Sequence, residues 1–207
     1  MTRVTVFDYG AGNLHSLVKA IEGDGVTVRL ETSPVAAVET DLLVLPGVGA
    51  FTNAAARIAP GRDAMREAIA AGLPTLGICL GMQLLFDASE EGPGTGLGVV
   101  PGMVRRLRSR RVPQIGWNSV DVEPGVAERF ASLPRMAYFA NSYVCDPRDV
   151  SAAVAYTTHD EDRFVSAVAT ANAVGVQFHP EKSSERGVQF VRDMVRALAR
   201  GTSAVNE

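Results

Sequence analysis

The segment that most constrains the fold is Gly-Ile-Cys-Leu-Gly at residues 77–81, which lies between an apolar run at 73–76 and a helix-like stretch at 82–86. A strand that turns sharply into a helix, with small residues around one central side chain, is typical of a nucleophile elbow. Glycine permits this turn because it has no Cβ atom to obstruct it. The turn should lift the Cys79 thiol above a sheet edge, at a helix N-terminus that favours the thiolate. The segment alone also fits a small cysteine buried in the core.

A second segment, Val-Gln-Phe-His-Pro-Glu at residues 176–181, supplies candidate partners for the thiol. Residues two apart in an extended chain point to the same side. His179 can therefore face Cys79 while Glu181 orients the imidazole and stabilises its charge. A nucleophile, a base and a residue that orients the base are the parts of a catalytic triad.

The composition favours one globular domain and argues against several other classes. With 207 residues and 46% hydrophobic content the chain can bury a full core, so we expect a single domain over residues 1–207 with a frayed tail at 201–207. A net charge of −3 gives no electrostatic reason to expect a nucleic acid or an anionic membrane as partner. The two cysteines, Cys79 and Cys145, suggest no disulfide framework, which fits a reducing cytoplasmic setting.

The first half of the chain alternates strands with helices. Its strands are continuous apolar runs, which indicate a mostly parallel sheet covered on both faces. In such folds ligands bind at the carboxyl ends of strands. The loops at 8–13 and 46–51 and the Cys79 elbow all fall at such ends. We expect strands at 4–8, 26–30, 41–45 and 74–78, and helices at 13–22, 62–71 and 80–88.

The second half is richer in short β segments and ends in an amphipathic helix at 184–200. Reversals are expected at 160–162 and 171–172, and Trp117 is expected between strands, in the core or at an interface. We expect strands at 99–107, 112–115, 119–122, 136–139, 152–156, 164–169 and 174–178.

The loop Pro-Gly-Val-Gly-Ala-Phe at 46–51 follows a buried strand. Its glycines allow unusual backbone angles, so the amides of Gly47, Val48 and Gly49 can point at a ligand oxygen. Together with the Leu80 amide, they could form an oxyanion hole for a tetrahedral intermediate. An ordinary glycine-rich turn would have the same sequence.

The remaining histidines and the basic run are not expected to take part in catalysis or metal binding. His15 and His159 are expected to be structural or solvated, and the few dispersed histidines and cysteines make no metal site. The basic run at 105–111 is expected to be a solvated edge, because the chain is acidic overall and has no interleaved aromatic residues there.

With these motifs in place, the chain resembles the class I, or triad, glutamine amidotransferases. Further segments narrow the resemblance to the glutaminase subunits of imidazole glycerol phosphate synthase, in order from residue 4 to about 200. At two positions where many relatives carry histidine, this chain has Gln114 and Asn141. The segments that carry the resemblance are 9–14, 46–51, 77–86, 116–118, 141–143 and 177–183.

The resemblance implies an α/β, flavodoxin-like fold with a mostly parallel central sheet, flanking helices and additional antiparallel strands in the second half. It implies that Cys79 attacks the carboxamide of glutamine, that His179 transfers protons and that Glu181 holds His179. It also implies that backbone amides of the 47–49 loop and of Leu80 stabilise the oxyanion. The residues around the glutamine head group would be Gln83, Ser142 and Tyr143.

The resemblance further implies a partner and no cofactor. The partner would be a (β/α)₈-barrel cyclase, in a heterodimer, which uses the ammonia to make imidazole glycerol phosphate and AICAR in histidine biosynthesis. The docking surface would include Asn13, Trp117, Tyr138 and Lys182. Three alternatives remain open: a glutaminase subunit for anthranilate, aminodeoxychorismate or pyridoxal phosphate synthesis, a cysteine hydrolase that acts alone, and a non-catalytic interaction subunit.

Overall fold

Strands from the first half of the chain and one strand from its last part form a parallel sheet in the computed structural model, which describes residues 1–10, 12, 14–23, 25–47, 49–126 and 132–203. Each neighbouring pair in this part of the sheet runs in the same direction. The strand order is β2 (Val26–Glu31), β1 (Thr2–Phe7), β3 (Leu42–Leu45), β4 (Thr75–Ile78) and β13 (Ala173–Val176).

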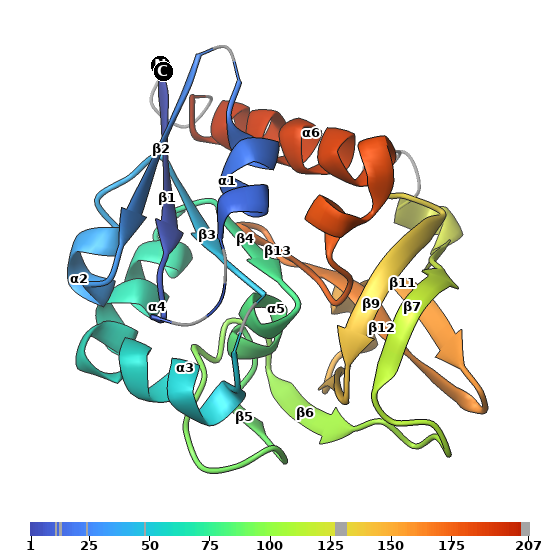
Figure 1. The fold of residues 1–207 in the computed structure, drawn as a ribbon. Helices are drawn as coiled ribbons and strands as arrows, with labels where there is room; N and C mark the ends of the chain where they lie inside the picture. The colour runs from blue at the N-terminus through green and yellow to red at the C-terminus, as the bar shows by residue number, and fades with distance from the viewer. Residues whose placement is uncertain (11, 13, 24, 48, 127–131, 204–207) are drawn as a thin grey trace.

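Further strands, from residue 88 onwards, extend the sheet beyond β13, mostly in antiparallel fashion (Figure 1). They follow in the order β12 (Asp162–Ala169), β10 (Tyr143–Pro147), β6 (Gly102–Arg106) and β5 (Ala88–Ser89), with β11 (Ala153–His159) on β12 and β8 (Asp121–Val122) on β11. A separate antiparallel ribbon consists of β7 (Gln114–Ser119) and β9 (Met136–Asn141).

Helices cover both faces of the parallel strands, as Figure 1 shows. One face carries α1 (His15–Ile21) and α6 (Ser184–Ser203), and the other carries α2 (Pro34–Ala37), α3 (Phe51–Ile58) and α4 (Arg62–Ala70). The short helix α5 (Leu80–Leu84) follows β4 directly, and single 3₁₀ turns are η1 (Ala59–Gly61), η2 (Pro124–Val126), η3 (Val150–Ala152) and η4 (Pro180–Lys182). Within the described ranges, no helix combines the length and apolar character needed to cross a membrane.

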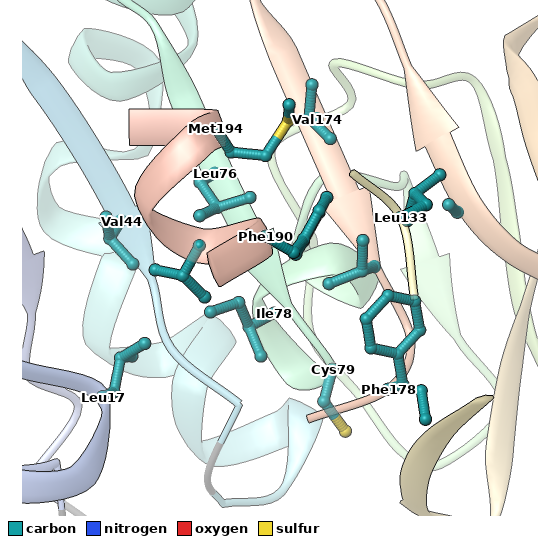
Figure 2. Close-up of a cluster of buried hydrophobic side chains, with 14 of the residues drawn as sticks. Leu17, Val44, Leu76, Ile78, Cys79, Leu133, Val174, Phe178, Phe190 and Met194 are labelled. Carbon is teal, nitrogen blue, oxygen red and sulfur yellow. The ribbon is translucent and has the colours of Figure 1, made fainter. Parts of the chain in front are cut away.

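The core consists of two layers separated by the sheet. Along β3, Leu42 and Val44 pack into the layer beneath α1 and α6, while Leu43 and Leu45 pack into the layer beneath α3 and α4. Figure 2 shows part of the first layer, in which Val44, Leu76 and Ile78 face Phe190 of α6. Burial on both faces explains why these strands are apolar runs without alternation. The predicted fold class is confirmed.

Two expected element boundaries are wrong, because the loop at residues 97–100 forms hydrogen bonds with the end of α5. The helix expected at 80–88 ends at Leu84, because the carbonyls of Leu84 and Leu85 accept hydrogen bonds from the amides of Leu97 (2.7 Å) and Val100 (2.9 Å). The same bonds hold the chain before residue 102 out of the ladder, so β6 begins at Gly102 and not at residue 99.

Other differences concern whole elements. Trp117 lies within β7 and not between strands, because Gly116 adopts a φ of 130° inside the strand without ending it. The sequence reading missed α2, α3, β5 and β10. Residues 201–203 continue α6, whereas the rest of the expected frayed tail lies outside the described residues.

Replacement of Phe190 should test the contribution of α6. Its side chain is fully buried, and its ring centroid lies 6.0 Å from that of Phe178. We expect Phe190→Ala to lower the free energy of unfolding by about 3–5 kcal/mol, since it removes apolar contacts and leaves a cavity. Urea unfolding followed by circular dichroism measures the change.

The neighbouring residue provides a matched control. Gln189 is exposed and makes only a helix-surface hydrogen bond to Asp193, at 2.7 Å. Gln189→Ala should cost less than about 0.5 kcal/mol. Equal losses for the two variants would contradict the packing role of Phe190.

Candidate active site

The pairing of β4 with β13 brings the thiol and the imidazole together. Ile78 pairs with Val176 at the end of this parallel ladder, and the Cys79 amide donates to the Val176 carbonyl at 2.7 Å. The residues after both strands therefore emerge side by side at one edge of the sheet. This register, and not proximity in the sequence, juxtaposes Cys79 with the 177–181 segment.

The Cys79 backbone has the strained conformation of an elbow. Cys79 precedes α5 with φ 47° and ψ −103°, a region that residues with a side chain rarely occupy. Its glycine neighbours are needed for space. A Cβ atom at Gly81 would overlap the Leu45 carbonyl, and one at Gly77 would lie 2.7 Å from the Gly81 oxygen. Figure 2 shows Cys79 at the border of the core, with its sulfur beyond Ile78.

A tight turn brings Glu181 onto His179. Nδ1 of His179 lies 2.8 Å from Oε1 of Glu181, and both side chains are almost fully buried. The segment is not extended as the sequence suggested, because Pro180–Lys182 form the 3₁₀ turn η4. Proline favours the start of such a turn, since it lacks the N–H that would remain unpaired there.

The charge of His179 depends on its neighbours. Burial disfavours the imidazolium, but the Cys79 thiolate and then the Glu181 carboxylate outweigh burial and raise the pKa of His179 to about 10. At neutral pH the imidazole of His179 therefore holds its second proton. By contrast, burial raises the pKa of the Cys145 thiol well above its ordinary value and keeps that thiol neutral.

The glycine-rich loop lies against the same two side chains. A Cβ atom at Gly47 would lie 2.9 Å from Cβ of Cys79 and 3.0 Å from Cε1 of His179. Gly49 adopts a φ of 113°, and Leu80 is the first residue of α5. Val48 lies outside the described residues.

Glu91, which was not identified from the sequence, binds the backbone at the end of the glycine-rich loop. The Phe51 amide, in the first turn of α3, donates to Glu91 Oε2 at 2.7 Å. A carboxylate is favourable there because it meets a free amide at a helix N-terminus. No local pattern links residues 51 and 91, so only the folded structure reveals the contact.

A chain of buried carboxamides runs from the Tyr143 backbone to the thiol. Nε2 of Gln83 donates to the Tyr143 carbonyl at 3.3 Å and to Oε1 of Gln177 at 3.3 Å, and Nε2 of Gln177 donates to Cys79 Sγ at 3.5 Å. Gln83 and Tyr143 were expected around the glutamine head group, whereas Gln177 had no assigned role. Ser142 gives its carbonyl to the Leu107 amide at 2.9 Å.

The β7–β9 ribbon presents apolar side chains to solvent. Ile115 (66% exposed), Trp117 (52%) and Met136 (51%) project from one side of the ribbon, and the Trp117 ring meets the Tyr138 ring edge-on with centroids 6.4 Å apart. We call these four residues the ribbon face. Ile115 and Met136 had not been identified from the sequence, and Asn13 lies outside the described residues.

The ribbon face is bonded directly to the 179–183 segment. The His179 amide donates to the Tyr138 carbonyl at 2.8 Å, and the Tyr138 amide donates to Ser183 Oγ at 2.9 Å. The exposed Lys182 lies in η4 between these contacts.

Several other residues noted in the sequence make contacts outside the triad. Arg105 is not solvated as expected, because the buried Asp162 binds its guanidinium at 2.7 and 2.8 Å. His159 lies at the end of β11, where Nε2 contacts the Arg111 carbonyl at 2.8 Å, and His15 begins α1. Gln114 and Asn141 are opposite each other across the ribbon and buried.

Comparison with known proteins identifies the class to which this fold and site belong. Residues 5–197 match the family model described as glutamine amidotransferase class-I. The chain therefore belongs to the class I glutamine amidotransferase family.

Individual relatives agree with the narrower resemblance. The chain is 41% identical to the imidazole glycerol phosphate synthase subunit HisH of Gloeothece citriformis (strain PCC 7424), over 96% of this chain and 97% of that protein. It is 42% identical to the subunit of the same name from Synechococcus sp. (strain JA-3-3Ab), over 96% and 95% of the two chains. The structure of PurLQS from Thermotoga maritima shares the fold, with a TM-score of 0.71 at 19% identity over 95% and 99% of the two chains. The resemblance predicted from the motifs is confirmed.

The pKa of His179 provides a direct test of the site. Cys79→Ser should lower this pKa, because it removes the thiolate, the stronger of the two influences that raise it. Glu181→Gln should lower it by a smaller amount. Titration of the His179 ring protons by NMR measures both changes, and a larger decrease in Glu181→Gln would contradict the order.

The raised pKa also predicts how the stability depends on pH. Imidazolium formation stabilises the folded protein fully below the ordinary pKa of 6.5, and this contribution is lost as the pH rises through about 10. In Cys79→Ser the loss should occur at lower pH.

Proposed function

We propose that this chain is the glutaminase subunit of an imidazole glycerol phosphate synthase, and that it hydrolyses L-glutamine at Cys79. The observation that carries the proposal is the triad arrangement, in which the β4–β13 register sets Cys79 beside His179 while Glu181 holds Nδ1 of His179 at 2.8 Å. The 41% identity to relatives named HisH favours this enzyme over other amidotransferases.

The charge state of the pair defines the order of the steps. The Cys79 thiolate attacks the side-chain carbonyl carbon of glutamine, and the carbonyl electrons move onto oxygen. As this tetrahedral intermediate collapses, the His179 imidazolium gives its proton to the nitrogen, the C–N bond breaks and ammonia leaves. A glutamyl thioester remains on Cys79.

Hydrolysis of the thioester reverses the proton transfer. Neutral His179 takes a proton from water, the resulting hydroxide adds to the thioester carbon, and the C–S bond breaks to release glutamate and the thiolate. Glu181 stabilises the imidazolium and fixes the ring orientation in both halves of the reaction.

Backbone amides would stabilise the oxyanion, and polar residues would hold the glutamine. The loop donors are Gly47, Val48 and Gly49, together with the Leu80 amide. The close approach of the Gly47 backbone to Cys79 and His179, which leaves no room for a Cβ atom, supports this assignment. We assign the glutamine head group to Gln83, Ser142 and Tyr143.

The partner that we propose is a (β/α)₈-barrel cyclase, which receives the ammonia within a cytoplasmic heterodimer. The ribbon face supports docking, because a contiguous apolar surface with an exposed tryptophan is typical of an interface. Its backbone contacts with the 179–183 segment would place the partner close to the site of ammonia release. By their resemblance to relatives, Asn13 and Lys182 are the other residues that we assign to the docking surface.

The whole chain, residues 1–207, acts as one glutaminase domain in this proposal. We further expect the isolated chain to be a slow glutaminase, because ammonia released without a partner is lost. Misalignment of one oxyanion donor in the 46–50 loop would lower the rate about 10²–10³-fold, the size of effect that such a switch needs.

Replacement of Cys79 should separate glutamine use from synthesis. Cys79→Ala should abolish synthesis of imidazole glycerol phosphate from glutamine while leaving synthesis from ammonium salts intact, since only ammonia production is lost. The assay uses the complex with its cyclase and follows product from each nitrogen source.

The second cysteine is the control. Cys145 is buried within the strand β10 and is not part of an elbow, so Cys145→Ser should retain most of the glutamine-dependent activity. A Cys79→Ala protein with normal glutamine turnover would overturn the proposed function.

Replacement of Lys182 should affect the complex more than the isolated chain. Lys182 directly follows Glu181 in η4, so a contact between its ammonium group and the partner would act on the catalytic turn. We expect Lys182→Ala to lower the ratio of cyclase-stimulated to basal glutamine hydrolysis. Glutamate release with and without the cyclase measures this ratio.

The matched control is Lys19→Ala, at an exposed position in the last turn of α1. This variant should keep the ratio of the unmodified protein. If the unmodified protein hydrolyses glutamine equally fast with and without the cyclase, there is no switch, whatever the variants do.

A further inference from the structure

Gln177 is a fully buried polar residue that contacts the sulfur of the proposed nucleophile. A buried carboxamide is costly unless its donor and its acceptor both find partners. The backbone amide of Gln177 continues the sheet by donating to the Ser166 carbonyl at 2.9 Å. The side chain takes no part in this ladder and instead contacts Gln83 and Cys79.

The orientation of the Gln177 amide follows from a backbone group. The Tyr143 carbonyl can only accept a hydrogen bond, so Gln83, at 3.3 Å, must present its NH₂ group there. The same NH₂ group meets Gln177 at 3.3 Å, so Gln177 must present its oxygen to Gln83. The Gln177 NH₂ group is then left to face Cys79 Sγ, at 3.5 Å.

We propose that Gln177 is a catalytic residue, whose side-chain amide donates a hydrogen bond to Cys79 Sγ and stabilises the thiolate. This inference rests on the proposed function of Cys79 as the nucleophile. A neutral donor suits the position, because it favours the thiolate without adding a proton that titrates. His179 supplies the charge and the mobile proton, while Gln177 fixes the direction of the sulfur lone pairs.

The pH dependence of alkylation tests the hydrogen bond without the glutaminase reaction. In a Cys145→Ser background only Cys79 reacts, and iodoacetamide consumes the thiolate form. Gln177→Met keeps the length of the side chain but removes the hydrogen-bond donor. We expect it to shift the midpoint of the rate–pH profile upward by about one pH unit, so that about tenfold less thiolate is present at any pH below the midpoint. Gln177→Asn, which keeps a buried amide but is too short to reach, should shift it in the same direction.

Gln114→Met is the matched control. It deletes another buried carboxamide, whose two polar atoms have no hydrogen-bond partner within the described part of the chain. Its alkylation profile should coincide with that of the background protein. Folded Gln177→Met and Gln177→Asn proteins that also keep the background midpoint would overturn the proposal.

A measurement on the unmodified protein tests the proposal even if the Gln177 variants fail to fold. The Nε2 protons of Gln177, followed by NMR, should shift with pH at the same midpoint as the alkylation rate, and an invariant resonance would overturn the proposal. These readouts do not depend on glutamine turnover. A shifted Gln177→Met profile combined with full activity in Cys79→Ala would support the hydrogen bond and reject Cys79 as the glutaminase nucleophile.

Discussion

The hydrogen bond from the Cys79 amide to the Val176 carbonyl, at 2.7 Å, is the contact on which the site depends. It closes the β4–β13 ladder at the point where both strands end. Because β13 comes from the last part of the chain yet inserts beside β4, two segments about 100 residues apart leave the sheet together. Cys79, Gln177 and His179 all lie within three residues after the last pair of this ladder, Ile78 and Val176. A shift of β13 by one residue would turn its side chains to the opposite face and dismantle the site.

Close packing of the backbone is the second constraint. The positive φ of Cys79 costs about 1–3 kcal/mol, and such strain persists only where the surroundings fix it. The fixed surroundings are the buried strand β4 on one side and α5, pressed against the Leu45 carbonyl, on the other. Gly77 and Gly81 are required by this approach of backbone to backbone, although neither has an unusual φ. Gly47 likewise allows its backbone to approach Cys79 and His179 closely, because a Cβ atom there would have no room.

Much of the fold, and the two segments that carry the candidate triad, could be predicted from the sequence, because each has a local pattern; the register that brings the two segments together is a long-range feature. Apolar runs such as 42–45 identified the parallel strands, and glycines around Cys79 identified the elbow. Features fixed by contacts between distant segments could not be predicted. The end of α5 depends on amides at 97 and 100, the burial of Arg105 on Asp162, and the orientation of Gln177 on the carbonyl of Tyr143. Trp117 was wrongly placed between two strands, whereas β7 continues through Gly116 and Trp117.

The bonds between β9 and the 179–183 segment limit how a partner can act on the site. Tyr138 is bonded through its carbonyl to the His179 amide and through its amide to Ser183 Oγ, which in turn donates to the His179 carbonyl at 2.6 Å. All three hydrogen bonds join backbone groups to each other or to the fully buried Ser183 hydroxyl, so breaking these bonds would leave unpaired polar groups in the interior. A displacement of β9 is therefore cheaper if His179 moves with it. A partner can change the imidazole position through the ribbon face only by binding one arrangement of β9 more tightly than another, since a ligand with equal affinity for both shifts neither.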